Sequence, residues 1–192
     1  MRLFLALNLG SDVRRRCYES TAPLRAVRPD LRWVAEEQLH LTLKFIGEQP
    51  DALVPRLADV VDGIAARSRE LDLAIGAVGA FPTFRRARVV YLAVDPDPKL
   101  ELLHHDAELS CAALDLPIEG RPFRPHVTIG RERDDADDAS RRALRQAARQ
   151  VRVHADAAVG SVDLMVSEPA EGGRRHRLLH AAPLRAATVV ER

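Results

Sequence analysis

Two histidines occur in the same local pattern at distant places in the chain. Residues 40–43 read His-Leu-Thr-Leu, and residues 126–129 read His-Val-Thr-Ile. On a β-strand, positions i and i+2 point to one face and positions i+1 and i+3 to the other. Each copy therefore anchors two aliphatic side chains in a core and presents an imidazole beside a hydroxyl on the opposite face. One copy alone is an ordinary half-buried strand, but the repeat indicates a shared site.

Paired imidazoles suit chemistry at a phosphodiester. A displacement at phosphorus needs the attacking and leaving oxygens roughly in line, so a base is needed on one side and an acid on the other. Histidine titrates near pH 6.5, so one copy can be neutral while the other is charged. The hydroxyls of Thr42 and Thr128 can bind the non-bridging oxygens, where charge develops. Lys44 lies at an even offset from His40, so we expect its cation beside the phosphate or at a solvated strand end.

The remaining chain predicts strands and helices that could hold the two motifs in place. Several strands are sequence neighbours joined by short turns, which favours an α+β fold with largely antiparallel pairing. Strands are expected at 2–8, 31–34, 40–46, 71–78, 88–94, 124–131, 158–166 and 176–184, and helices at 12–26, 51–69, 97–114 and from the acidic turn at 132–138 to 150.

Composition limits the classes of protein. The 192 residues carry a formal net charge of +1, so binding to a polyanion must come from local clusters of charge. Cys17 and Cys111 form no C-x-x-C pattern, and neither a disulfide framework nor a zinc site is expected. No apolar stretch approaches the length of a membrane span, so we expect a soluble, cytoplasmic protein without a membrane partner.

The segments around both motifs resemble the two-histidine (2H) phosphoesterases, most closely their RNA 2′,3′-cyclic phosphodiesterase branch, also called 2′-5′ RNA ligases. The resemblance extends over residues 2–7, 33–34, 39–48, 79–82 and 121–131. It implies one bilobal domain over residues 1–192, with two pseudo-symmetric lobes of largely antiparallel sheet and outer helices around a central cleft. It also implies no metal and no organic cofactor, and no cluster with metal-ligand spacing accompanies either motif.

The resemblance implies a role for each site residue. It implies that His40 is the proton donor, that His126 is the proton acceptor, and that Thr42 and Thr128 hold the phosphate. Arg131 resembles a substrate-contacting arginine. Its odd offset from His126 would place it on the opposite face of an ideal strand, so this role requires a bulge or the end of the strand.

Contacts to the terminal base are less determined by the sequence. The family's C-terminal hairpin usually carries an aromatic residue where residues 174–177 read Arg-Arg-His-Arg, which leaves stacking in that region open. Trp33 and Phe45 are candidates for stacking on a base. Strand parity, however, places Phe45 opposite His40, so we expect it in the core, and Trp33 as well.

The activity implied is hydrolysis of an RNA 2′,3′-cyclic phosphate end to a 2′-phosphomonoester. Three alternatives remain open, namely 2′-5′ ligation as the reverse reaction, hydrolysis of small cyclic phosphates, and non-catalytic RNA binding. A long basic track beside the cleft would favour RNA over small molecules, and paired imidazoles disfavour a pure binding module. We expect a monomer whose partners are RNA ends carrying the cyclic phosphate, such as tRNA fragments, or nucleotides.

Overall fold

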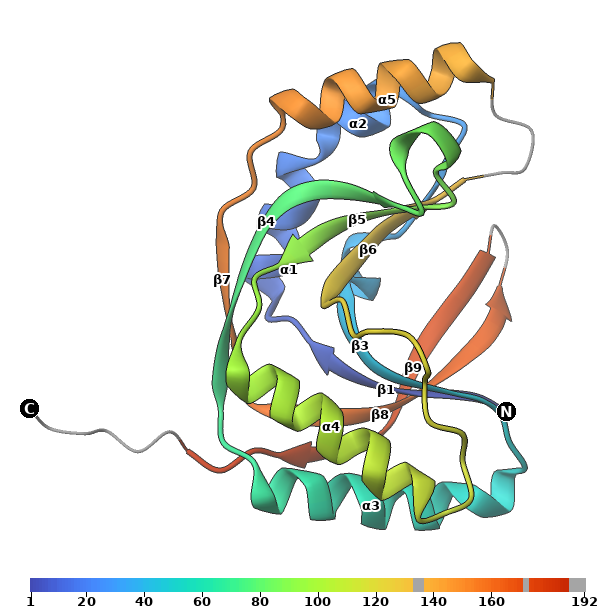
Figure 1. Ribbon diagram of the computed structural model, residues 1–192, viewed down its shortest axis with the longest axis vertical. Coiled ribbons are helices and arrows are strands. Elements are labelled where there is room, and N and C mark those ends of the chain that lie inside the picture. Colours follow the sequence, from blue (N-terminus) through green and yellow to red (C-terminus); the bar gives the residue numbers. More distant parts are fainter. Residues whose placement is uncertain (133–136, 171–172, 187–192) are drawn as a thin grey trace, which may run out of the picture.

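The computed structural model describes residues 1–132, 137–170 and 173–186. Within these residues, nine strands form one sheet in the order β7-β4-β5-β6-β3-β1-β8-β9, with β2 paired to β6 (Figure 1). The pairings between neighbouring strands are antiparallel. The expected α+β class with largely antiparallel pairing is confirmed. Among the described helices, none is long and apolar enough to cross a membrane.

The strands are β1 (Arg2–Asn8), β2 (Arg32–Trp33), β3 (His40–Glu48), β4 (Leu71–Phe81), β5 (Val89–Val94), β6 (His126–Arg131), β7 (Ala155–Val159), β8 (Ser161–Ala170) and β9 (Gly173–Pro183). The α-helices are α1 (Ser11–Ser20), α2 (Ala22–Val27), α3 (Val54–Arg67), α4 (Pro98–Ala112) and α5 (Asp138–Gln150). Three short 3₁₀ helices are η1 (Glu36–Gln38), η2 (Asp51–Leu53) and η3 (Phe84–Arg86).

The two motif strands occupy the middle of the sheet. β3 and β6 pair antiparallel at Leu41 and Val127, and three further strands lie on each side of this pair. Helices α2 and α5 cover one end of the molecule, while α3 and α4 cover the other (Figure 1). The arrangement gives two similar halves that meet at the two histidine motifs.

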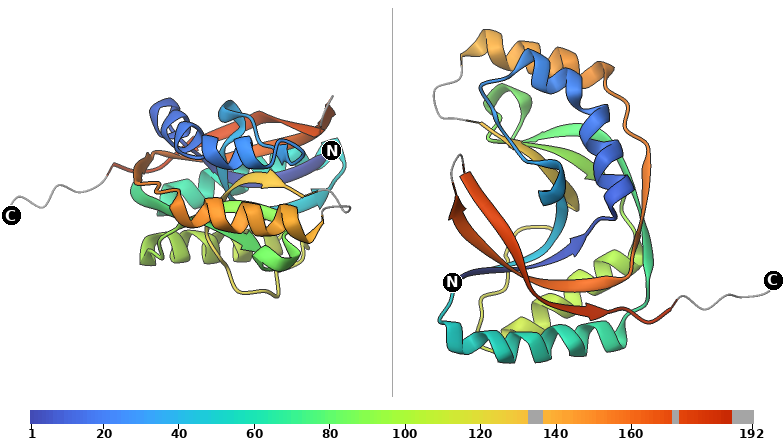
Figure 2. Two further views of the ribbon diagram at one scale, coloured as in Figure 1. Left: turned by 90° about the horizontal axis from the view of Figure 1, so that it is seen from above. Right: turned by 180° about the vertical axis from the view of Figure 1, so that it is seen from behind.

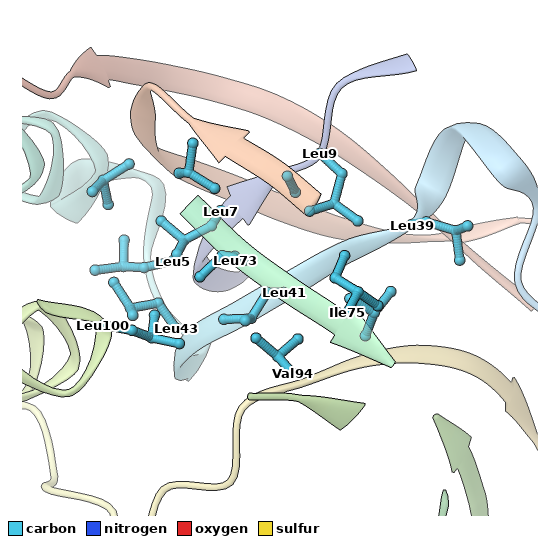
Figure 3. Close-up of a cluster of buried hydrophobic side chains, with 14 of the residues drawn as sticks. Leu5, Leu7, Leu9, Leu39, Leu41, Leu43, Leu73, Ile75, Val94 and Leu100 are labelled. Carbon is cyan, nitrogen blue, oxygen red and sulfur yellow. The ribbon is translucent and has the colours of Figure 1, made fainter. Parts of the chain in front are cut away.

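The core forms on the face of β3 and β6 that their aliphatic residues occupy. Leu41 and Val127 are fully buried, as the alternation of the motifs predicted. The leucines of β1 and β3 face Leu73 and Ile75 of β4 across this core (Figure 3). Because the apolar residues on one face of β3 are held there, the alternate residues, which include His40, must lie on the other face.

Two element predictions differ from the structure. The single helix expected over 12–26 is divided into α1 and α2, because the hydroxyl of Thr21 donates to the carbonyl of Cys17 and Pro23 cannot continue the helical hydrogen bonds. The single strand expected over 158–166 is two strands, β7 and β8, which meet at Gly160 and belong to different halves of the sheet (Figure 2). The apolar alternation runs through Gly160, so the pattern did not show this break.

The acidic turn expected at 132–138 is only partly described, because residues 133–136 lie outside the described ranges, as do 171–172 of the C-terminal hairpin. Glu132 is not a solvated turn residue. Its carboxylate pairs with the buried guanidinium of Arg28, and both side chains are almost inaccessible to solvent. This pair anchors the chain directly after Arg131.

Candidate active site

Each motif histidine is oriented by a carbonyl two residues before it. The ring nitrogen Nδ1 of His40 lies 2.7 Å from the carbonyl oxygen of Gln38, and Nδ1 of His126 lies 2.7 Å from that of Arg124. A carbonyl only accepts, so Nδ1 carries the proton in both rings. Nε2 of each ring is therefore the atom that can accept or donate a proton. His40 lines the cleft, and His126 lies close enough to the cleft residue Arg131 to be influenced by its charge.

A threonine follows each histidine by two residues, on the same face of its strand. Oγ1 of Thr42 lies 3.2 Å from Nε2 of His40, so its hydroxyl can donate to the neutral ring or turn toward a ligand. Thr128, two residues after His126, lines the same cavity as Thr42. The expected pairing of imidazole and hydroxyl on one face is thus present in both strands.

Each motif strand has a bulge at the fourth residue of its motif. The register between β1 and β3 skips Leu43, and the register between β5 and β6 skips Ile129. A bulge adds one residue to one strand and shifts the alternation of faces by one position. Beyond the bulge, side chains at odd offsets from the histidine therefore return to the histidine's face. The two halves share this device, and it applies to the fifth residue after each histidine.

In β6, the fifth residue is Arg131, which lines the cavity together with Thr42 and Thr128. The bulge that a cleft-facing Arg131 required is present. Burial and the neighbouring Arg2 hold the pKa of Arg131 below its ordinary value. Its guanidinium is the cation that accompanies the two threonines.

In β3, the fifth residue is Phe45, and the same shift reverses two expectations. Phe45 is 61% exposed and lines the cleft, so its expected place in the core is wrong. Lys44 is 3% exposed, and its Nζ donates to Glu108 Oε2 at 2.7 Å and to the carbonyl of Pro117 at 2.9 Å. The expectation that Lys44 shares the face of His40 is therefore wrong, because the bulge turns it inward.

A third histidine lies against the first. The ring of His176, on β9, meets the ring of His40 edge-on with centroids 4.9 Å apart, and its centroid lies 5.0 Å from that of Phe4. Gln38 joins the two histidines, because its carbonyl holds the ring of His40 while its Oε1 accepts from the backbone N–H of His176 at 2.6 Å. Burial, with the nearby His40, Arg131 and Arg174, lowers the pKa of His176 to about 4.

No pattern in the sequence indicated that His176 would face the site. The sequence of residues 174–177 contains this histidine, but the face on which its side chain lies depends on how β9 pairs with β8. That pairing has its own register shift, between Leu164 and Met165. No local pattern marks that shift.

His126 is enclosed by two aromatic rings from β4 and β5, in its own half of the sheet. Its centroid lies 5.0 Å from that of Phe81 and 5.3 Å from that of Tyr91, both near edge-on. Phe81 and Tyr91 are stacked with centroids 4.2 Å apart. Gly79 makes this packing possible, because a Cβ there would lie 2.3 Å from the ring of Tyr91. Each catalytic candidate thus has an aromatic surround built from neighbouring strands.

Burial also sets the charge of the two motif histidines. The pKa of His40 is lowered mainly by burial and further by the charges of Arg131 and His126, while the carbonyl of Gln38 opposes the shift. The pKa of His126 is lowered by burial and by Arg131, against the carbonyl of Arg124. Both rings therefore favour the neutral form near pH 7, and an anion bound beside one of them would restore its affinity for a proton.

The cleft is a cavity of about 620 Å³ that extends from the two threonines to the β8–β9 hairpin. Trp33 lies at its wall, where it packs against the core as expected but also faces the cavity, and its Nε1 donates to the carbonyl of Arg28 at 2.8 Å. Basic side chains from several elements line this cavity: Arg2, Arg32, Arg131 and Arg174. Across the described ranges, no three His, Cys, Asp or Glu side chains gather closely enough to hold a metal ion.

Residues 15–171 match the 2′-5′ RNA ligase superfamily. The chain belongs to this superfamily. The recognition of a two-histidine phosphoesterase from the two motifs is therefore confirmed, and with it the expectation of an enzyme of this family.

Similar proteins agree with this membership. A Thermus thermophilus protein named RNA 2′,3′-cyclic phosphodiesterase is 32% identical over 143 residues, which cover 71% of each chain. A Geobacillus stearothermophilus protein of the same name is 30% identical over 129 residues, or 67% of this chain, but the match spans only 41% of that longer protein. The crystal structure of E. coli LigT complexed with 3′-AMP is 25% identical, with a TM-score of 0.75 over 95% of this chain and 97% of that one.

Proposed function

We propose that this chain hydrolyses RNA 2′,3′-cyclic phosphate ends to 2′-phosphomonoesters by acid–base catalysis with two histidines and without a metal ion. The observation that carries the proposal is the matched orientation of His40 and His126. In both rings Nδ1 is held by a carbonyl, so both Nε2 atoms are available for proton transfer. Such a pair serves a reaction that needs a base and an acid at once.

In the hydrolytic direction, we assign His126 as the base and His40 as the acid. Nε2 of His126 takes a proton from water while the water oxygen bonds to phosphorus. The bond between phosphorus and the 3′-oxygen breaks, and Nε2 of His40 gives its proton to that oxygen. The product carries a 2′-phosphate and a free 3′-hydroxyl, and proton exchange with solvent restores both rings. The anionic cyclic phosphate would supply the charge that favours protonation of His40.

Thr42, Thr128 and Arg131 would stabilise the charge that develops on the non-bridging oxygens. The three side chains line one cavity, and the cation of Arg131 can offer two parallel N–H groups to a phosphate. Lys44 has no part in this group, because its ammonium is already bound to Glu108.

The terminal nucleotide would occupy the remaining cavity toward the β8–β9 hairpin. Trp33, Phe45 and His176 present rings there, and a cavity of about 620 Å³ has room for a nucleotide. The family's usual hairpin aromatic is thus replaced by a neutral imidazole. The name of the E. coli LigT complex, which contains a mononucleotide, is consistent with this use of the cleft.

Two alternatives involve the same atoms. Ligation through a 2′-5′ bond is the reverse reaction with the roles of the histidines exchanged, and small cyclic phosphates would need the same phosphate contacts. A pure binding module is disfavoured, because binding requires no pair of oriented imidazoles.

The deciding experiment incubates the protein with RNA ending in a 2′,3′-cyclic phosphate in the presence of EDTA. We expect a 2′-phosphate end and no 3′-phosphate, with His126→Ala as the inactive control. A 3′-phosphate product would contradict the cleavage of the bond to the 3′-oxygen. Complete loss of activity in EDTA with rescue by a divalent metal would overturn the metal-free mechanism.

A further inference from the structure

A second basic surface lies outside the cleft, on helix α5, which covers one end of the molecule together with α2. Along α5, Arg142, Arg145 and Arg149 are exposed at positions i, i+3 and i+7, so they form a stripe on one helical face. Arg152 continues the stripe after the helix ends, where its guanidinium donates to the carbonyl of Arg149.

This stripe borders a hollow rather than a flat surface. Arg145, Arg149 and Arg152 line a cavity of about 530 Å³ together with Phe84 and residues 76–78 of β4. Phe84 begins η3, and the two residues that follow it, Arg85 and Arg86, are exposed. Three arginines from α5 and the turn after it therefore line one depression, which we name the α5 groove: Arg145, Arg149 and Arg152. Helix η3, with the exposed Arg85 and Arg86, packs against α5 beside it.

No carboxylate of the described residues neutralises the groove arginines. Within the described ranges, none of them takes part in an ion pair, whereas Arg28, Arg67 and Arg177 each have a carboxylate partner. The net charge is only +1, so this local excess is balanced by acidic residues elsewhere. A favourable interaction with the helix dipole could account for arginines near the end of α5, but not for those of η3.

The groove is a cavity separate from the cleft, but the chain that follows β4 leads from the ring of His126 to it. Phe81 contacts the ring of His126, and Phe84, which lines the groove, follows three residues later. Three residues of chain span at most about 10 Å. Phosphates along a nucleic-acid strand are separated by roughly 3.4 Å of axial rise, so a few nucleotides suffice to reach from the site of His126 to the groove.

We propose that the α5 groove binds the phosphodiester backbone of the substrate RNA beyond its terminal nucleotide. The proposal rests on the proposed function and deepens it, because it makes RNA, and not a small cyclic phosphate, the preferred substrate. Guanidinium groups recognise phosphates without regard to sequence, and Phe84 offers a ring between them. Acting at the body of the RNA, the groove would change binding without changing the chemical step.

The test compares Arg145→Gln/Arg149→Gln with Arg56→Gln/Arg67→Gln, which removes the same charge from α3 at the opposite end of the molecule. An RNA hairpin ending in a 2′-phosphate, which cannot react, is titrated by fluorescence anisotropy at several salt concentrations. Each lost phosphate contact lowers the slope of log affinity against log salt by about 0.7–0.9. We expect the α5 variant to lower the slope by roughly 1.4–1.8 and to weaken binding about tenfold or more at 0.1 M salt. We expect the α3 variant to change neither.

The same variants are then assayed on two substrates. The α5 variant should lower kcat/KM for a hairpin ending in a cyclic phosphate, through KM, and leave turnover of a nucleoside 2′,3′-cyclic phosphate unchanged. Equal loss on both substrates, no loss on either, or an equal effect of the α3 variant would overturn the proposal, as would a wild-type protein that does not bind the hairpin. Absence of all turnover would refute the proposed function instead, because the binding titration needs no reaction.

Discussion

Lys44→Met tests the bulge in β3 directly. Lys44 is 3% exposed, and its ammonium bonds Glu108 at 2.7 Å and the carbonyl of Pro117 at 2.9 Å. Methionine fills a similar volume without the charge, so the main effect is an uncompensated carboxylate inside the protein. Breaking a buried pair by removing one partner costs about 3–5 kcal/mol of the free energy of unfolding.

Thermal unfolding is the appropriate assay. For a chain of this size, each kcal/mol shifts Tm by roughly 2–4 °C, so Lys44→Met should lower Tm by roughly 6–20 °C. Lys99 is the other lysine of the chain and is exposed, and Lys99→Met should stay within about 0.5 kcal/mol of the wild type. Lys44→Met/Glu108→Gln should recover more than half of the loss, because no buried charge is then left without its partner.

Enzyme activity distinguishes an inward-facing Lys44 from a Lys44 on the face of His40, as strand parity suggested. Well below its Tm, Lys44→Met should retain a KM close to that of the wild type, since the ammonium does not face the cleft. An unchanged Tm combined with a raised KM would refute the reasoning, because it would mean that Lys44 contacts the phosphate.

Three further predictions concern the cleft itself. His40→Ala and His126→Ala should each lower kcat about 10²–10⁴-fold. On an activated aryl phosphodiester, whose leaving group needs no proton, only His40→Ala should recover its activity. Recovery of activity in His126→Ala instead would exchange the two roles. Thr42→Ala and Thr128→Ala should each cost about 1.5–3 kcal/mol in kcat/KM, and a larger loss than in the histidine variants would make phosphate positioning the dominant effect. Because the pKa of His176 falls from 6.5 to about 4 on folding, the unfolded chain binds more protons between those values, and the free energy of unfolding should decrease as pH falls through this window. Urea titrations should show a shallower decrease for His176→Phe, and an identical slope would contradict the shift.

The type and facing of the motif residues could be predicted because they depend on local alternation. His40 and Thr42 share a face, and Leu41 is buried, as period-two alternation requires. The prediction is correct up to Leu43, which is buried as expected, and fails from Lys44 onward, directly after the bulge. A bulge depends on how β1 pairs with β3, and residues 40–46 alone contain no sign of it. Lys44 and Phe45 were consequently assigned to the wrong faces.

The same limit applies to residues brought in from distant strands. The sequence showed that Arg131 needs a bulge or the end of the strand to face the site, but not whether it does so. It did not place His176 at all. Its contact with His40 depends on the order β3-β1-β8-β9, in which strands far apart in the chain become neighbours. The division at Gly160 was missed for a related reason, since apolar residues alternate through it in the sequence, at Ala158, Val162, Leu164 and Val166. In the structure the buried positions change from Ala157 and Val159 before the glycine to Val162 and Leu164 after it.

That division has a consequence for how the chain is made. β8 pairs with β1 across the ends of the sequence, from Arg2 with Ser167 to Ala6 with Asp163. At synthesis rates of about 5–20 residues per second, β1 would wait roughly 8–30 s for this partner, with one edge unpaired and open to other strands. Completion of the sheet, and with it the placement of His176 against His40, is therefore a late event in folding. Active protein should appear only after the C-terminal hairpin has joined the first strand of the chain.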